Sequence, residues 1–443
     1  MEGIEISAGD TAWVLMAAAL VLLMTPGVAF FYGGMVRAKS VLNMMMMSFL
    51  AIGIVTVLWV AFGYSLAFGD GGNGFIGDLS LSGLQGLVGQ FAINGGVYPI
   101  PALIFAMFQL MFAILTIALV TGAIADRTKF LAWGIFAAVW VTIVYFPVAH
   151  WVFDFGNEEL GGGGAGWLAN LGVLDFAGGT AVHINAGAAA LALVIVIGKR
   201  VGFGRVPMKP HSLPLVLLGA ALLFFGWFGF NAGSALGAGQ VAALAFTNTM
   251  VATAAGIVGW LLVEKLRDGH ATSLGAASGA IAALVAITPA CAFVAPWGAI
   301  VIGLLAGVIC AFAVTFKYRF GYDDSLDVVG VHLVGGMVGC LLIGFLATTE
   351  VNELGKDGLF YGGGWGVLGT QAIGAVAVMA YSFIVTLILA FIIKAVIGLR
   401  INRDDELTGI DVAAHAESAY ELGDSGGGGV LAGAGHHSHG GER

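Results

Sequence analysis

Two histidines, His183 and His332, lie inside long apolar stretches of the sequence, and their surroundings are similar. Asp175 stands eight residues before the first histidine, and Asp324 stands eight residues before the second. An ionisable side chain is costly inside an apolar stretch, so it is a candidate functional residue. Neutral imidazole has one hydrogen-bond donor and one acceptor. Two imidazoles that meet could therefore bond to each other and relay a proton by exchanging tautomers.

The elements that must position these histidines are membrane helices. The chain has 443 residues, of which 59% are hydrophobic and 10% are charged, and its mean hydropathy is +0.98. Soluble domains carry about 25% charged residues, so this composition excludes an ordinary soluble domain. The three cysteines all lie in apolar stretches, which gives neither a disulfide framework nor the spacing of metal ligands. We expect no metal, no cofactor and no nucleic-acid partner.

Eleven apolar stretches are long enough to cross a hydrocarbon core of about 30 Å. They lie at about 12–34, 42–68, 100–124, 130–151, 176–198, 213–235, 238–264, 274–294, 297–316, 328–347 and 366–398. The first residues are acidic and contain no Lys or Arg, so the N-terminus is expected outside and the C-terminus inside. This orientation places every basic residue except Lys356 on the inner side, which agrees with the positive-inside rule.

The predicted organisation has three parts. Residues 1–11 form an outer N-terminus, residues 12–398 form the transmembrane domain, and residues 399–443 form a cytoplasmic tail whose part 426–443 is expected to be disordered. His183 falls in the fifth span and His332 in the tenth, so a five-span duplication must be inverted. Eight helical residues rise by about 12 Å, so both histidines reach the central third of the membrane, one from the outer side and the other from the inner side. The two rings could then touch.

Four segments strongly resemble the Amt/Mep/Rh ammonium transporter family, in its bacterial Amt branch. These are Thr25-Pro-Gly-Val-Ala-Phe-Phe-Tyr-Gly-Gly34, Asp175-Phe-Ala-Gly-Gly-Thr-Ala-Val-His-Ile-Asn-Ala-Gly187, Gly226-Trp-Phe-Gly-Phe-Asn-Ala-Gly-Ser234 and Asp327-Val-Val-Gly-Val-His332. The resemblance implies an all-α integral membrane fold with eleven transmembrane helices. Spans 1–5 and 6–10 form the inverted repeat, and a long eleventh helix follows. It also implies a homotrimer in the plasma membrane with one pore in each subunit.

By this resemblance, Phe112, Phe153 and Ser234 form an outer site for ammonium. Aromatic rings attract a cation, and a hydroxyl accepts an N–H bond. The family commonly has Trp where this chain has Phe153, and Trp151 lies two residues away. Either residue could complete the aromatic site.

The resemblance assigns the remaining positions to the pore and its support. His183 and His332 are the paired pore histidines, Phe230 stacks with Phe112 as a phenyl gate, and Trp227 and Phe108 line the pore. Asp175 is expected to support the start of the fifth span as a helix cap, and Asp323, Asp324 and Asp327 are expected to do the same for the tenth.

Five residues of the tail resemble the family's cytoplasmic segment: Gly409, Asp411, His415, Glu417 and Tyr420. In the family this segment packs against neighbouring subunits, and a PII-type signalling protein can dock on that face. For this chain, we expect contacts of the tail with neighbouring subunits and docking of a PII-type protein.

The function implied is ammonium uptake rather than enzymatic catalysis, with methylammonium as an analogue. Ammonium is captured outside, loses a proton and passes through a hydrophobic pore with the twin-histidine relay. The residues leave open whether the proton follows the ammonia through the pore or returns outside. Family precedent favours net movement of charge. Two rivals remain: an ammonium sensor that signals through its tail, and a redox subunit with haem between the two histidines. The tail is short and carries no kinase-like or cyclase-like domain, which argues against sensing alone.

Overall fold

The computed structural model describes residues 5–71, 73–157 and 163–420. Ten helical stretches in this part of the chain are long and apolar enough to cross a membrane. They are Ala8–Met35, Ala38–Phe68, Ala102–Ile124, Phe130–Phe153, Gly179–Ile197, Leu213–Gly233, Gln240–Asp268, Pro296–Phe320, Val329–Leu346 and Gly366–Val396. A shorter apolar helix, α11, covers Ser273–Ile287. The predicted tail region 426–443 lies outside the described residues.

Several of these stretches consist of more than one regular element. The α-helices are α1 (Ala8–Met35), α2 (Val41–Leu58), α3 (Tyr64–Phe68), α4 (Ala102–Val120), α5 (Phe130–Trp140), α6 (Phe146–Phe153), α7 (Trp167–Leu171), α8 (Asn185–Ile197), α9 (Leu213–Gly233), α10 (Gln240–Asp268), α11 (Ser273–Ile287), α12 (Pro296–Ala313), α13 (Phe316–Phe320), α14 (Val334–Leu346), α15 (Gly366–Val396), α16 (Arg403–Thr408) and α17 (Ile410–His415). π-helical turns cover Trp59–Gly63, Val141–Tyr145, Gly179–Ile184 and Val329–Leu333.

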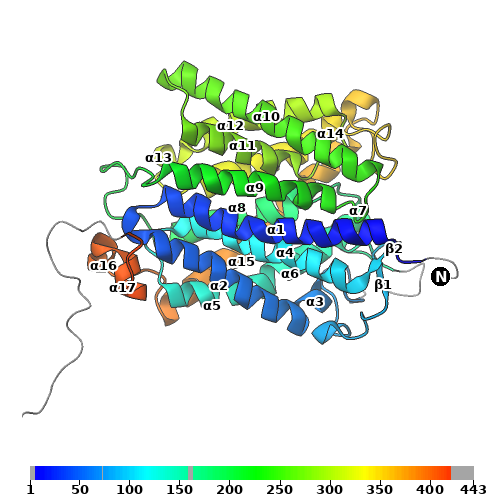
Figure 1. Cartoon of the computed structure of the whole chain (residues 1–443), viewed down its shortest axis with the longest axis horizontal. Helices are drawn as coiled ribbons and strands as arrows, with labels where there is room; N and C mark the ends of the chain where they lie inside the picture. The colour runs from blue at the N-terminus through cyan, green and yellow to red at the C-terminus, as the bar shows by residue number, and fades with distance from the viewer. Residues whose placement is uncertain (1–4, 72, 158–162, 421–443) are drawn as a thin grey trace, which may run out of the picture.

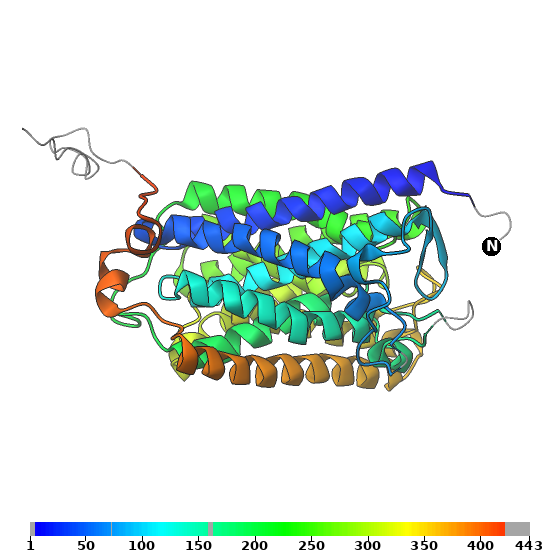
Figure 2. The same cartoon turned by 90° about the horizontal axis from the view of Figure 1, so that it is seen from below.

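The long helices run side by side along one direction, so their ends form two opposite faces of the bundle (Figure 1). The described N-terminal residues lie at one end, and α16 and α17 lie at the other (Figures 1 and 2). Helix α1 packs along α9, and α10 packs along α12. Helix α15 extends along one side for nearly the whole length of the bundle, as Figure 2 shows.

Helix α11 is shorter than the stretch predicted at 274–294. It ends at Ile287, because Pro289 follows and a proline cannot continue a helix. The side chain of Asn248 in α10 donates to the carbonyl oxygens of Cys291 and Val294, both at 2.7 Å. These two bonds stabilise the irregular segment before α12, so the second half of this stretch turns instead of remaining helical.

A β-hairpin also departs from the all-α prediction. Strand β1 (Phe91–Ile93) pairs antiparallel with β2 (Val97–Pro101), and Ala92 faces Tyr98 across the pair. The hairpin lies at the end of the bundle opposite to α16 and α17 (Figure 1). It leads directly into α4, which carries Phe108 and Phe112.

Candidate functional site

The segment that carries His183 begins at a buried carboxylate. Asp175 accepts hydrogen bonds from the backbone N–H groups of residues 178 to 181 at 2.7–3.3 Å, and from the hydroxyl of Thr180. The first turns of a helix leave N–H groups without helical partners, and a carboxylate there also favours the positive end of the helix dipole. The geometry agrees with the cap predicted for Asp175.

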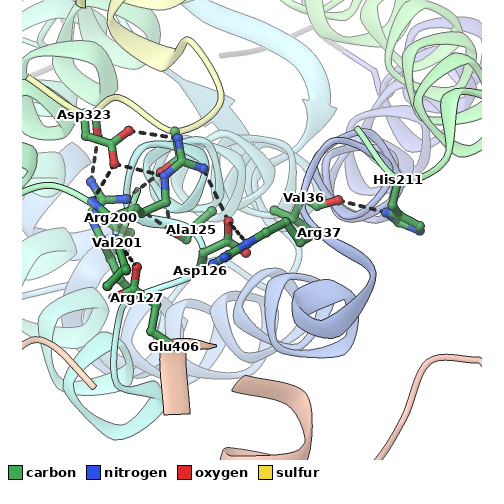
Figure 3. A network of polar contacts seen from close by, with 12 residues as sticks. Val36, Arg37, Ala125, Asp126, Arg127, Arg200, Val201, His211, Asp323 and Glu406 are labelled. Carbon is green, nitrogen blue, oxygen red and sulfur yellow. Dashed lines mark hydrogen bonds and ion pairs between the residues drawn. The ribbon is translucent and has the colours of Figure 1, made fainter. Parts of the chain in front are cut away.

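The segment that carries His332 has a similar start, but only one of the three predicted aspartates caps it. Asp324 accepts from the backbone N–H groups of Val328 and Val329 at 3.1 and 2.7 Å. Asp323 instead pairs with Arg200 at 2.8 Å (Figure 3). Asp327 has a left-handed backbone (φ 66°) and pairs with Lys317 at 2.5 Å. The expected capping role is therefore wrong for Asp323 and Asp327, because both carboxylates are directed to basic side chains.

The two imidazoles meet in the buried centre of the molecule. Nδ1 of His332 lies 3.3 Å from Nδ1 of His183, and the ring planes are inclined by 22°. Both side chains are buried. Nε2 of His183 has no hydrogen-bond partner among the described residues. The predicted meeting of the two rings is confirmed, and His183 retains one nitrogen that could interact with a small molecule.

Reciprocal glycine contacts bring these rings together. Gly187 lies four residues after His183, and a Cβ added to it would lie 2.4 Å from the backbone nitrogen of Leu333. Gly336 lies four residues after His332, and its Cβ would lie 2.9 Å from the side chain of Ile184. Each glycine thus faces the residue that follows the opposite histidine. Only glycine permits so close an approach of the two helices.

A haem between the two histidines does not fit this arrangement. An iron held between two imidazole nitrogens requires about 4 Å between them, since each metal–nitrogen bond is about 2 Å long. The facing nitrogens here are 3.3 Å apart, and Trp227 and Phe230 pack on the His183 ring with centroid distances of 5.4 and 6.0 Å. The rings occupy the space that a porphyrin would need.

Aromatic side chains continue from the histidine pair toward the end that bears the β-hairpin. The ring centroids of Phe112 and Phe230 lie 4.4 Å apart, with their planes inclined by 43°. Phe108 packs edge-on against Phe112 at 72°. The predicted stack is therefore a tilted pair. Trp227 donates from Nε1 to the hydroxyl of Thr288 at 2.8 Å, which fixes its ring beside His183.

Beyond the phenyl pair lies a pocket of about 460 Å³. Phe112, Phe153, Ser234 and Asp175 all contribute to its lining. The Ser234 hydroxyl donates to the carbonyl oxygen of Phe230 at 2.9 Å, so its lone pairs remain available to an N–H donor. Phe112 lies in α4, Phe153 lies in α6 and Ser234 directly follows α9, and the structure brings these three together as the resemblance implied. Asp175 joins them from the loop before Gly179–Ile184.

Trp151 does not line this pocket. Its Nε1 donates to the carbonyl oxygen of Phe75 at 2.7 Å, and its ring packs on Tyr381 with centroids 4.6 Å apart. Phe153 is on the same helix, α6, but two residues later, which directs the two side chains to different faces. Of the two alternatives left open by the sequence, the geometry favours Phe153.

Residues that the sequence did not indicate complete the pocket. Asn94, at the turn of the β-hairpin, donates to the carbonyl oxygen of Phe153 at 2.8 Å and accepts from the N–H of Phe155 at 2.7 Å. Gln109 and Phe293 also line it. On the other side of the histidine pair the space is much smaller: two cavities of about 10 Å³ each are lined by His332 together with Tyr32.

Comparison with known proteins decides the family. A sequence model described as the Ammonium Transporter Family matches residues 12–420. The chain belongs to this family. An ammonium transporter of Mycobacterium tuberculosis (strain ATCC 25618 / H37Rv) is 57% identical over 433 residues, which cover 94% of this chain and 90% of the relative. The crystal structure of Saccharomyces cerevisiae Mep2 is 36% identical with a TM-score of 0.82, and covers 90% of this chain and 89% of that one.

A solved structure of a sensor Amt protein is also similar, with 30% identity, a TM-score of 0.83 and coverage of 94% of this chain and 100% of that one. These findings confirm the resemblance to ammonium transporters. The chain is a multi-pass membrane protein of a transporter family, not an enzyme.

The tail of this transporter docks on its own helical bundle as far as residue 420. Asp411 accepts from the backbone N–H groups of Leu42 and Asn43 at the start of α2, at 3.0 and 2.8 Å. His415 bonds to the side chain of Asn43 at 3.1 Å, and Tyr420 bonds to His211 at 2.8 Å. The tail therefore contacts the bundle through polar groups at the end opposite to the aromatic-lined pocket.

We predict that Phe153→Trp strengthens ammonium binding at the pocket of this transporter. Indole attracts a cation more strongly than phenyl does, and the difference of about 0.5–1 kcal/mol corresponds to a two- to fivefold lower half-saturation concentration. Steady-state currents as a function of ammonium concentration would measure this. Trp151→Phe is the matched control and should leave the value unchanged; an equal shift in both variants would contradict the assignment of Phe153.

Asp154, at the end of α6, is expected to make the stability of the fold depend on pH. Its carboxylate lies 3.2 Å from Nδ1 of His150 and accepts from the N–H of Gly156. Burial raises the pKa of Asp154 to about 6, the Gly156 N–H opposes this rise, and the charge of Asp70 adds to it. An unfolded Asp has a pKa of about 3.9. Protonation of Asp154 thus stabilises the folded state. This contribution to the free energy of unfolding is fully present below pH 3.9 and is lost as the pH rises through 6.

We therefore expect Asp154→Asn to remove about 2 kcal/mol of this pH dependence. Melting curves of both proteins between pH 4 and pH 7 would test this. The wild-type midpoint should fall relative to that of the variant as the pH rises. Parallel midpoints across the range would contradict the prediction.

Proposed function

We propose that this chain takes up ammonium across the plasma membrane, by outer capture, deprotonation and passage of ammonia through a hydrophobic pore with a histidine relay. One observation carries the proposal: a buried pair of hydrogen-bonded histidines lies behind a phenyl pair and an aromatic-lined pocket. The family supports ammonium as the substrate.

Capture depends on the outer pocket. Phe112 and Phe153 offer aromatic surface to a cation, and the Ser234 hydroxyl offers lone pairs to its N–H groups. The carboxylate of Asp175 has its oxygens occupied by N–H and O–H donors, so it orients the helix start instead of binding the ion. Deprotonation is favoured inward of this pocket, because a bare cation at the membrane centre costs several kcal/mol and neutral ammonia avoids most of that cost.

The relay depends on the histidines. Ammonia can approach the free Nε2 of His183, while the two Nδ1 atoms share a hydrogen bond. A proton that moves along this pair would follow the ammonia and make transport electrogenic. A proton that returns outside would make it neutral.

The topology and assembly form part of the same proposal. We infer eleven crossings in residues 12–398, with α11 as the short one, the N-terminal residues 1–11 outside and the tail from 399 inside. The reciprocal glycine contacts support the inverted repeat of spans 1–5 and 6–10. The proposed assembly is a homotrimer in the lipid bilayer, and a PII-type protein is the proposed partner at the face that holds α16 and α17.

Currents on solid-supported membranes would test this function. Vesicles that contain the purified chain should give currents with ammonium and smaller currents with methylammonium, and none with potassium. Uptake of ammonium without current would support neutral transport. Equal currents with potassium, or no ammonium flux at all, would refute the proposal.

A second candidate is ammonium sensing through the tail. The similarity to a sensor Amt protein and the polar docking of the tail on α2 favour it. The sensing hypothesis predicts that ammonium changes the position of the tail even when no ammonium is transported. A spin label at an exposed tail position such as Val412 would report ammonium-dependent movement in a variant whose flux has been abolished.

A further inference from the structure

A pocket of about 310 Å³ lies between the loop 198–209 and α13. Helix α13 lies at the end of the bundle that holds α16 and α17 (Figure 1). Its volume is at the lower end of the range of small-ligand sites. Three of its lining residues are basic, namely Arg200, Arg205 and Lys317, and no acidic residue lines it among the described residues. The transport route assigned above does not use this pocket.

Two of the three basic side chains are fixed in place. Arg200 bonds to Asp323 through two of its nitrogens at 2.8 and 2.9 Å, and lies 3.3 Å from Asp126 (Figure 3). Lys317 pairs with Asp327 at 2.5 Å. These carboxylates offset most of the charge of Arg200 and Lys317. The two side chains therefore form fixed walls of the pocket and contribute little uncompensated charge to it.

Arg205 supplies the charge that is not offset. Its side chain is exposed, and no carboxylate lies within ion-pair distance of it among the described residues. The segments 198–209 and 316–327 together contain six basic and three acidic residues, and Asp126 and Glu406 contact these segments from neighbouring elements, which leaves a smaller positive surplus. A site with this composition would attract an anion.

Aromatic residues surround the same pocket. The rings of Phe203 and Tyr318 stack with centroids 5.6 Å apart, and Lys199 and Lys317 lie over them at 5.9 and 5.5 Å. Tyr318 is 64% exposed and Phe320 is 70% exposed. Exposed aromatic and basic residues at the end of a membrane helix are typical of the lipid–water interface, where basic pockets receive anionic headgroups.

We propose that this pocket binds a phosphate group, with Arg205 as its main ligand and with Arg200 and Lys317 as fixed cationic walls. The planar guanidinium of Arg205 matches two phosphate oxygens at once. The phosphate can belong to an anionic phospholipid or to a free phosphate compound. The site stands independently of the transport mechanism proposed above.

Binding of dioctanoyl phosphatidylglycerol to the full chain in detergent, measured by native mass spectrometry, tests the site. Arg205→Ala should weaken binding about five- to tenfold, and Arg205→Lys less. Arg403→Ala is the matched control, because Arg403 is an exposed arginine at the same end but outside the pocket. Dioctanoyl phosphatidylcholine carries the same phosphodiester, but its choline cation cancels the net charge. It should therefore bind the wild-type chain more weakly than phosphatidylglycerol and lose less binding in Arg205→Ala.

Competition by inorganic phosphate distinguishes the two sources. Displacement of the phosphatidylglycerol by phosphate supports a site for free phosphate compounds, and persistence of the lipid supports a headgroup site. Equal weakening by Arg205→Ala and Arg403→Ala would show general surface charge and overturn the proposal. Equal binding of the two lipids to the wild-type chain, without phosphate binding, would also overturn it.

Discussion

Replacement of both central histidines, in His183→Ala with His332→Ala, is expected to abolish selectivity against potassium. The two rings are buried at the centre of the molecule and contact each other at 3.3 Å. Their removal leaves space for several waters, each of which needs about 30 Å³. A cation that keeps some hydration avoids much of the cost of crossing, so the ratio of potassium to ammonium current should rise at least about tenfold.

Currents with both ions in reconstituted vesicles would measure this ratio. The relay should also fail in the double variant, because neither alanine can accept or donate a proton. His270→Ala is the control, since His270 is exposed in the loop between α10 and α11. Ammonium currents with unchanged selectivity in the double variant would refute the relay.

Asp175→Ala is expected to have the largest effect on stability. Its carboxylate accepts from the backbone N–H groups of residues 178 to 181 and from the Thr180 hydroxyl, all buried. Each buried donor left unpaired costs about 1–3 kcal/mol, so we expect a loss of about 3–5 kcal/mol after partial relaxation. His183 lies on the same helical start, so ammonium transport should be lost as well.

Asp175→Asn distinguishes the effect of the size of the side chain from the effect of its negative charge. Its amide keeps one oxygen acceptor but turns an NH₂ toward the donors, so its melting midpoint should lie between those of wild type and Asp175→Ala. Asp268→Ala removes an exposed carboxylate that, among the described residues, pairs only with the neighbouring Arg267, and it should leave the midpoint unchanged. Wild-type stability in Asp175→Ala would contradict the capping role.

The contact between His183 and His332 could be predicted because it depends on residue spacing within single helices. The spacing from aspartate to histidine is the same in both halves, and helical rise converts that spacing into depth. The roles of Asp323 and Asp327 could not be predicted in this way. Which of three neighbouring carboxylates caps a helix depends on the backbone path, and Asp327 adopts a left-handed conformation that directs it to Lys317.

The aromatic-lined pocket was only partly predictable for a different reason. Its aromatic members lie in segments that resemble a known family, so the resemblance supplied them. Asn94 comes from a loop with no helical periodicity, and its contacts with Phe153 and Phe155 depend on the hairpin. The early end of α11 follows from Pro289, whereas the bonds from Asn248 depend on packing between distant segments.

The reciprocal contacts of Gly187 and Gly336 have a consequence for proton transfer. Backbone atoms meet here, so the separation of the imidazoles depends on the crossing of two rigid helices and not on attraction between the rings. A change in protonation alters the force between the rings but leaves the crossing in place. If a proton is relayed between the two rings as proposed, the helix crossing sets the length of its path, and a methyl group at either glycine would lengthen that path.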